Sequence, residues 1–403
     1  DASLLEGLVE RYVPDLVLTA GDGAEKATEL ELDQYSDGES LPEEIQMYVR
    51  RSNHAEPVHP DLSLLLSTSG STGSPKLVRL SADNVLANGE QIREGLRIDQ
   101  EERAVTSLAF SYSFGLSVVH SHLLAGASLV VSGRNIMLRN FWDDVRQHEA
   151  TSFSGVPYSY ELIRRVGFER MELPSLRTLA QAGGKLGRDM IQYYHEIMDA
   201  KGGDFVVMYG QTEATARISV LPPELLPEKL GGVGFPLPGG DVEIRPLDGS
   251  AGTVERGETG ELVYCGPNVM MGYAETRTDL ARGDELEGVL VTGDSGYVDD
   301  DGCIFITGRL KRFAKVMGLR VSLDEVEAKL QAAGSVAALD GGDRVVVCCV
   351  PASEEAVRDS VGELAARMKV HPRNFVLEVV EKFPQLPNGK IDYRALQELT
   401  GQG

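Results

Sequence analysis

Residues 67–76 combine glycines, hydroxyls and one lysine in a pattern that suits phosphate binding. Glycine lets backbone N–H groups turn toward an anion, and the Ser and Thr hydroxyls add further donors. A lysine supplies a compact positive charge for phosphate oxygens. The lysine lies behind a proline, three residues after the last glycine, so the spacing does not fit the nucleotide loop of kinases and GTPases. The predicted phosphate-binding residues are Thr68, Ser69, Gly70, Ser71, Thr72, Gly73 and Lys76.

A flexible Ser/Gly linker is the alternative interpretation of this segment. Its surroundings argue against a linker, because an apolar strand pattern at residues 62–66 precedes it. An extended segment at 77–80 follows, and Ser81 then stands where a helix cap is expected. These flanking elements favour an ordered loop between two strands.

Two acidic side chains follow predicted strands, at the edge where α/β sheets bind ligands. Glu213 comes shortly after the strand at 205–208 and could hold Mg²⁺, which prefers carboxylate and phosphate oxygens. Asp294 ends the segment 291–294, and its two oxygens could accept hydrogen bonds from ribose hydroxyls. Taken singly, Glu213 could instead be a solvated glutamate at the start of a helix, and the segment ending at Asp294 could be an ordinary turn.

Basic residues occur at several positions in the last third of the chain. Residues 308–312 and 315–318 form a basic connector, for which a charged linker is the ordinary interpretation. Lys390 follows a glycine turn, where a solvated surface lysine is the default. His120 and His122 lie in an apolar helix pattern and are predicted to be structural.

Composition limits the classes of partner. The chain has 403 residues, 42% of them hydrophobic, and a formal charge of −23. That charge repels nucleic acids and acidic membranes, so neither is expected as a partner. No apolar run approaches the roughly 20 residues that span a bilayer, and no leader is recognised, so a cytoplasmic location is expected. The four cysteines lack metal-ligand spacing and are predicted to be core thiols: Cys265, Cys303, Cys348 and Cys349.

The pattern of elements predicts an α/β fold in two domains. Strands and amphipathic helices alternate to about residue 221, which indicates sheets flanked by helices. Glycine, proline and short strands then predominate, as in a β-barrel-like subdomain at about 222–309. From residue 310 to 403 a small α+β domain is expected, with a capping box at 322–325. Residues 1–309 would form the core, with its first subdomain incomplete.

Taken in order, these segments resemble the adenylate-forming superfamily of acyl- and aryl-CoA synthetases, peptide-synthetase adenylation domains and luciferases. The matching segments after the loop are 183–185, 209–213, 260–273, 292–294, 308–309, 315–318 and 389–390. Single matches are weak evidence, whereas a whole series in the family's order is specific. The part before the loop is shorter than in typical members. Leu77 and Leu386 also depart from the family pattern beside the loop and before the lysine.

The resemblance implies a two-step reaction and a role for each matching residue. ATP and Mg²⁺ would activate a carboxylic acid as an acyl-adenylate with release of pyrophosphate, and a thiol would then accept the acyl group. Lys390 and Thr212 would be catalytic, Glu213 would hold the metal, and Lys311 would be the hinge of a mobile C-terminal domain. The implied nucleotide-binding residues are Gly183, Gly184, Lys185, Tyr209, Gly210, Gln211, Asp294, Arg309 and Gly318, besides the loop.

The same resemblance places an acid pocket around an aromatic segment at 111–115. Its predicted members are Tyr112, Phe114, Gly155, Val156, Ala182, Met208 and Ala214, with Ser154 and Thr215 as further candidates. Amino-acid-activating relatives use an aspartate in this segment, where this chain has Phe114 and Gly115. An amino-acid substrate held by that ion pair is therefore disfavoured.

The expected acceptor is coenzyme A, with a separate carrier protein or a non-thiol nucleophile as alternatives. A different class of hypothesis is a non-catalytic relative that keeps nucleotide binding. The presence of Glu213, Asp294, Arg309 and Lys390 together argues against that class, because a scaffold has no chemical need for them.

Overall fold

The computed structural model describes residues 2–19, 35–37, 45–51, 57–67, 76–310, 312–317, 319–368, 370–386 and 390–401. They divide into two compact units, one made of residues 1–82 and 271–285 and the other of 83–270 and 286–403. The first unit is therefore discontinuous in sequence. The predicted boundary near residue 310 divides the chain differently and stays a proposal.

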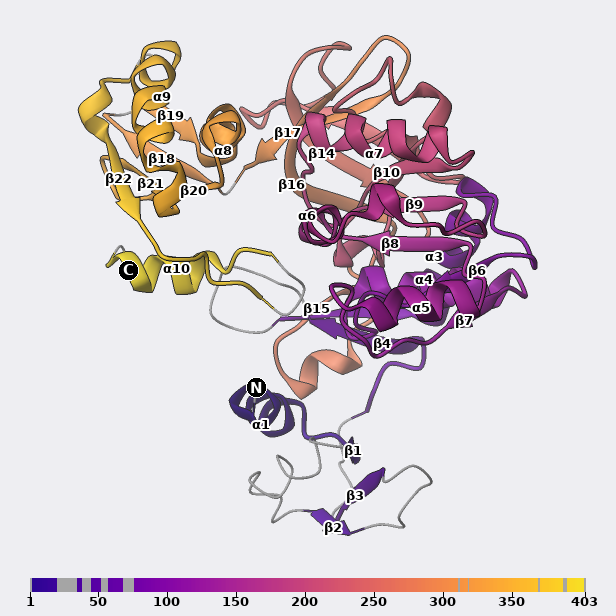
Figure 1. Ribbon diagram of the computed structural model, residues 1–403. Helices are drawn as coiled ribbons and strands as arrows, with labels where there is room; N and C mark the ends of the chain where they lie inside the picture. Colours follow the sequence, from indigo (N-terminus) through magenta and orange to yellow (C-terminus); the bar gives the residue numbers. More distant parts are fainter. Residues whose placement is uncertain are drawn as a thin grey trace. The chain divides into compact units, whose positions relative to one another are not determined.

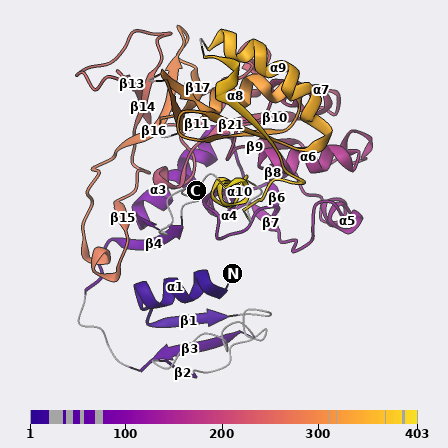
Figure 2. The ribbon, with the colours of Figure 1, turned by 90° about the vertical axis from the view of Figure 1, so that its left-hand side faces the viewer.

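The first unit contains two small antiparallel sheets. One has the strand order β1-β3-β2 and lies beside helix α1, and the other has the order β15-β5-β4 (Figure 2). Arg79 on β5 is fully buried, and its guanidinium donates to Glu285 Oε2 at 2.5 Å and to the Met271 carbonyl at 3.2 Å. The elements are α1 (Ala2–Tyr12), β1 (Leu16–Thr19), β2 (Tyr35–Asp37), β3 (Gln46–Arg50), β4 (Leu62–Ser67), β5 (Leu77–Ser81), β15 (Gly272–Ala274) and η4 (Arg277–Ala281).

The second unit is built around a seven-stranded sheet of order β12-β11-β10-β9-β8-β6-β7 (Figure 1). The five strands from β7 to β10 pair in parallel, and β11 and β12 are antiparallel. The strands are β6 (Arg103–Val105), β7 (Ser128–Val130), β8 (Ser152–Gly155), β9 (Thr178–Gln181), β10 (Asp204–Tyr209), β11 (Ser219–Leu221) and β12 (Phe235–Pro236).

Helices cover both faces of this sheet. An aromatic core that includes Trp142, Tyr160 and Tyr194 packs α5, α6 and α7 against one face. Phe114 and Val118 of α4 pack on the other face, and Ile92 of α3 packs in a neighbouring cluster. The helices are α3 (Ala82–Gly95), α4 (Ser113–Leu124), α5 (Arg139–Gln147), α6 (Pro157–Arg165) and α7 (Arg188–Ala200), with turns η1 (Phe168–Arg170), η2 (Thr212–Ala214) and η3 (Pro223–Leu225).

The region predicted as a β-barrel-like subdomain, about 222–309, contains a four-stranded antiparallel sheet of order β13-β14-β16-β17. Its apolar contacts join Ile244, Leu262 and Ile304. The strands are β13 (Asp241–Arg245), β14 (Gly260–Cys265), β16 (Val289–Val298) and β17 (Ile304–Arg309). Three cysteines, Cys303, Cys348 and Cys349, are buried free thiols as predicted, whereas Cys265 is half-buried.

The last 90 or so residues form a small α+β arrangement, as the sequence predicts. A three-stranded sheet of order β20-β21-β22 packs against α8 and α9, and β18 and β19 form a hairpin. Ser322 caps α8, accepting from the Glu325 N–H at 3.3 Å. The elements are β18 (Phe313–Val316), β19 (Leu319–Ser322), α8 (Leu323–Leu330), η5 (Gln331–Ala333), β20 (Val336–Asp340), β21 (Val345–Cys349), η6 (Pro351–Ser353), α9 (Glu354–Arg367), η7 (Pro372–Asn374), β22 (Phe375–Val379) and α10 (Tyr393–Thr400).

No helix in the described ranges has the length and apolar character that a membrane crossing requires.

Candidate functional site

Asp294 is the centre of a polar cluster at the carboxyl end of β10. The Tyr209 hydroxyl donates to Asp294 Oδ2 at 2.5 Å, and Arg309 Nε lies 3.2 Å from Asp294 Oδ1. Burial raises the pKa of Asp294, although Arg309 and the Tyr209 hydrogen bond oppose that effect. Burial and the neighbouring carboxylate also raise the pKa of Tyr209 well above its usual value, so the phenol remains a donor. Three residues predicted to bind the nucleotide therefore meet at one point.

The glycine turn after β9 leaves no room for side chains. Gly183 has a φ of +82°, and a Cβ there would lie 2.4 Å from the Tyr112 hydroxyl oxygen. A Cβ at Gly184 would lie 3.1 Å from Pro157. Lys185 follows on the exposed surface. The turn presents bare backbone beside Tyr112, which suits the flat face of a base.

The segment after β10 brings the predicted catalytic residues to the same end of the sheet. A Cβ at Gly210 would lie 2.0 Å from the Ala216 carbonyl oxygen, so only glycine fits there. Gln211 Nε2 donates to the Thr292 carbonyl at 3.4 Å, next to Asp294. Thr212 Oγ1 and Ser113 Oγ are 3.1 Å apart, which ties this segment to the first turn of α4.

A strained turn fixes the direction of the chain after Glu213. Thr215 has φ 62° and ψ −54°, and the Ala216 N–H donates to the Ala214 carbonyl at 2.6 Å. These values define a classic γ-turn, which is rare and costly for a β-branched residue. The Asn268 side chain stabilises it by donating to the Ala214 carbonyl at 2.8 Å. Strain of this kind clusters at functional sites.

Lys390 reaches this site from the C-terminal region. Its Nζ lies 5.8 Å from the centre of the Tyr112 ring. Burial and the nearby Arg309 together lower the pKa of Lys390 to about 8, although Asp294 and Glu213 partly offset these two effects. The structure thus brings the predicted catalytic lysine into the field of the nucleotide-binding cluster.

The predicted acid pocket lies on the α4 face of the sheet. Phe114, Val156, Ala182 and Met208 are buried in one apolar cluster, with Tyr112 packed beside it. Gly155 ends β8, Ala214 is buried in an adjacent cluster, and both lie in the same unit as the sheet. His122 is buried, and its Nδ1 lies 2.8 Å from the Val118 carbonyl oxygen.

Part of the predicted site lies outside the described residues. Lys76 is described within the first unit, where its Nζ pairs with Glu275 at 2.7 Å. The undescribed predictions are Thr68, Ser69, Gly70, Ser71, Thr72 and Gly73 of the loop, the hinge Lys311, and Gly318.

One charged residue of this site was missed by the sequence analysis. Arg217, just before β11, is buried, and its Cζ lies 4.8 Å from the centre of the Phe114 ring. The only signal for it was a charge inside the apolar segment 216–220, which sequence alone cannot assign to a core or a surface.

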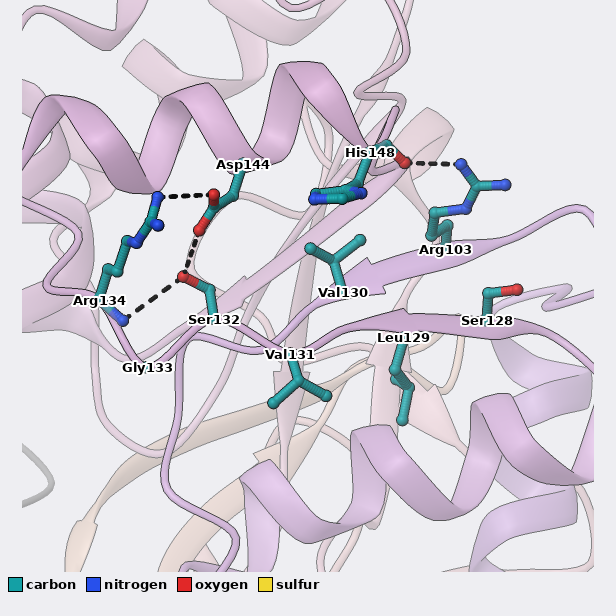
Figure 3. Close-up of a pocket in the computed structure, with 10 residues that line it drawn as sticks. All are labelled: Arg103, Ser128, Leu129, Val130, Val131, Ser132, Gly133, Arg134, Asp144 and His148. Carbon is teal, nitrogen blue, oxygen red and sulfur yellow. Dashed lines mark hydrogen bonds and ion pairs between the residues drawn. The ribbon is translucent and has the colours of Figure 1, made fainter. Parts of the chain in front are cut away.

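A hollow of about 570 Å³ lies elsewhere, at the β6–β7 edge of the sheet (Figure 3). Its charged groups already satisfy one another, since Arg134 pairs with Asp144 at 2.7 Å and Arg103 donates to the His148 carbonyl at 2.6 Å. None of the predicted site residues lines it: its lining is Arg103, Ser128, Leu129, Val130, Val131, Ser132, Gly133, Arg134, Asp144 and His148.

The donor set fits a magnesium ion that is shared with a substrate. Among the residues described, no group of three or more His, Cys, Asp or Glu could cage a metal by itself. Mg²⁺ commonly takes one or two carboxylates and completes its shell with water and substrate phosphates. Glu213, close enough to Asp294 and Lys390 to influence their pKa values, is a suitable single carboxylate.

The fold and this site define a nucleotide-binding enzyme of the adenylate-forming class. The family model for AMP-binding enzymes matches residues 8–274, and the chain belongs to that family.

Its relatives cover most of the chain. A 4-coumarate–CoA ligase 5 from Oryza sativa subsp. japonica is 28% identical over 96% of this chain and 73% of its own length. An oxalate–CoA ligase from Arabidopsis thaliana is 29% identical over 84% of this chain and 68% of its own. The chain thus spans only part of either relative.

Solved structures of the O-succinylbenzoate–CoA synthetase from Bacillus subtilis have the same fold. Its complex with the acyl-adenylate intermediate aligns with a TM-score of 0.71 at 26% identity, over 89% of this chain and 72% of that one. Its complex with ATP and a magnesium ion aligns with a TM-score of 0.69 at 26% identity, over 87% and 73%. The α/β fold expected from the resemblance is therefore confirmed.

Proposed function

We propose that this protein activates an aryl or acyl carboxylic acid with ATP and transfers the acyl group to a thiol, coenzyme A in the first place. The observation that most supports this proposal is the position of Lys390. It lies beside Tyr112 and close enough to Asp294 and Glu213 for their charges to affect its pKa. The family membership and the names of the two CoA-ligase relatives support the same function.

The first half-reaction makes the acid reactive. A carboxylate oxygen attacks the α-phosphorus of ATP, the bond from that phosphorus to the β-bridging oxygen breaks, and pyrophosphate leaves with the electron pair. Negative charge builds up on the phosphoryl oxygens in the transition state, and fixed cations stabilise it. The Lys390 ammonium would be the cation that acts there.

The other site residues position the nucleotide. The Asp294 carboxylate accepts from the ribose, and its present partners Tyr209 and Arg309 orient it. The bare backbone at Gly183 and Gly184 receives the adenine. Glu213 would hold Mg²⁺, which when bound supplies positive charge to the phosphates. The loop at 68–76 would grip the outer phosphates.

The second half-reaction requires the thiol to reach the acyl carbon. Attack by the thiolate on the acyl carbon forms the thioester. The bond between that carbon and the phosphate oxygen breaks, and AMP leaves with its electron pair. We propose that the domain at 310–403 turns at Lys311 between the two steps, which withdraws Lys390 and brings residues 315–318 to the site.

Pyrophosphate release from ATP and Mg²⁺ across a panel of aryl, short-chain and medium-chain acids tests this function. Release that depends on a few acids supports it, and the product mass with coenzyme A, a carrier-protein thiol or an amine identifies the acceptor. Measurable ATP binding without release from any acid would instead identify a non-catalytic nucleotide-binding relative.

A further inference from the structure

Arg217 is a buried cation for which the described part of the chain supplies no carboxylate. It is 3% exposed, and its Nε–H has no acceptor among the described residues. Burial, partly offset by Tyr112, lowers the pKa of Arg217 to about 9, so the guanidinium is still charged at neutral pH. A buried charge without a partner destabilises the folded protein.

The fold holds the Arg217 backbone in place. Asn88 Nδ2 donates to the Arg217 carbonyl at 2.9 Å, and Asn88 Oδ1 accepts from the Arg217 N–H at 3.3 Å. Asn268 Nδ2 donates to the same carbonyl at 3.1 Å, and both asparagines are almost fully buried. With the γ-turn at Thr215 just before it, Arg217 emerges from a backbone that has little freedom to carry its charge elsewhere.

The guanidinium lies in the acid pocket proposed above. Its Cζ is 4.8 Å from the centre of the Phe114 ring, and that ring is 6.2 Å from the Tyr112 ring. Lys390 Nζ is in turn 5.8 Å from the centre of the Tyr112 ring. Each of these two neighbouring aromatic rings therefore lies close to a cation, and one of the cations, Lys390, is the proposed partner of the carboxylate that reacts.

The Phe114 ring offsets only part of the cost of burying this charge. A desolvated cation–π contact contributes less than an unpaired buried ion costs. A bidentate carboxylate is the partner that a guanidinium fork fits best. The remaining imbalance is what a bound anion would remove.

We infer that Arg217 pairs with a second carboxylate of the acid substrate, so that the preferred substrate is a dicarboxylic acid. One carboxylate is activated beside Lys390, and the other binds Arg217 next to Phe114. This inference rests on the proposed function and names its substrate class.

The test compares acids in pairs that share a carbon skeleton and differ only in the second carboxylate. Suitable pairs are glutaric and valeric acid, adipic and hexanoic acid, and terephthalic and 4-methylbenzoic acid. The wild-type protein should release pyrophosphate with a kcat/KM at least about tenfold higher for the dicarboxylic member of the best pair, as one charge-paired contact provides.

Arg217→Gln should reverse this preference. Loss of the cation should lower kcat/KM for the dicarboxylic acid by roughly 100-fold or more and leave the monocarboxylic acid unchanged or improved. Arg217→Lys keeps the charge but not the fork, so it should retain part of the preference. Arg139→Gln, which removes an exposed arginine of α5, is the control and should change neither acid.

Each other result has a definite meaning. Equal wild-type use of both members of every pair would overturn the inference without any variant. A loss in Arg217→Gln that is equal for both members would show that Arg217 only maintains the structure, and would overturn it too. No pyrophosphate from any acid in the wild-type protein would overturn the proposed function itself.

Discussion

The Tyr209 hydroxyl donates to Asp294 Oδ2 at 2.5 Å, so the end of β10 is joined to β16 through the carboxylate proposed to bind ribose. Arg309 holds the other oxygen at 3.2 Å. Both carboxylate oxygens are therefore engaged, and a ribose hydroxyl must share or replace one of these contacts. The sequence-based expectation that both oxygens serve the ribose stays a prediction.

Tyr209→Phe should weaken nucleotide binding. The change leaves Asp294 Oδ2 buried with one donor fewer, which costs about 1–3 kcal/mol. We expect the KM for ATP to rise roughly tenfold or more, measured by pyrophosphate release. Tyr297→Phe, on the strand β16 that also carries Asp294, is the matched control, because the Tyr297 ring stacks on Phe305. An equal effect of the two variants would contradict the role given to Tyr209.

Gly183→Ala should damage the site by a steric clash. The added Cβ would lie 2.4 Å from the Tyr112 hydroxyl oxygen at a φ of +82°. Gly126→Ala is the control for backbone strain alone, because its φ is +70° and its Cβ would meet nothing within 4 Å.

We expect pyrophosphate release to fall strongly in Gly183→Ala and to stay near wild type in Gly126→Ala. The double variant Gly183→Ala/Tyr112→Phe should recover part of the loss, because the clashing oxygen is gone. Identical behaviour of the two single variants would argue against a close contact at Gly183.

Glu213→Gln should raise the magnesium requirement. An amide is a weaker ligand for a hard cation than a carboxylate, so the Mg²⁺ concentration for half-maximal pyrophosphate release should increase. ATP binding measured with a chelator present should change little. An unchanged Mg²⁺ dependence would remove Glu213 as the proposed ligand.

The adenylation step should decline as the pH rises above about 8. Burial lowers the pKa of Lys390 to about 8, so the ammonium loses its proton as the pH rises through that value. The charge that stabilises the phosphoryl oxygens is then lost, and the rate of adenylate formation should fall.

Lys390→Arg should move that decline upward, since a guanidinium keeps its charge. Conversion of supplied acyl-adenylate to thioester should show no fall over the same range. Parallel declines in both half-reactions would contradict the assignment of Lys390 to the first one.

Local sequence patterns predict several elements of the fold. The strand pattern at 62–66 and the extended segment at 77–80 match β4 and β5 to within one residue, because short apolar runs bounded by turn residues predict strands. Ser322 caps α8 as its capping-box spacing predicts. These features depend on neighbours within a few residues.

Features set by distant contacts could not be read from the sequence. The pairing of β5 with β15, which places residues 271–285 in the first unit, joins segments almost 200 residues apart. The burial of Arg217 depends on Phe114 and Asn88, which the sequence does not connect to it. The γ-turn at Thr215 likewise needs Asn268 to stabilise it.

The most direct test of the account is the effect of Lys390→Ala on the two half-reactions measured separately. The account predicts that adenylate formation from acid and ATP is lost, whereas conversion of supplied acyl-adenylate to the thioester continues near the wild-type rate. Retained adenylate formation, or equal loss of both half-reactions, would contradict it.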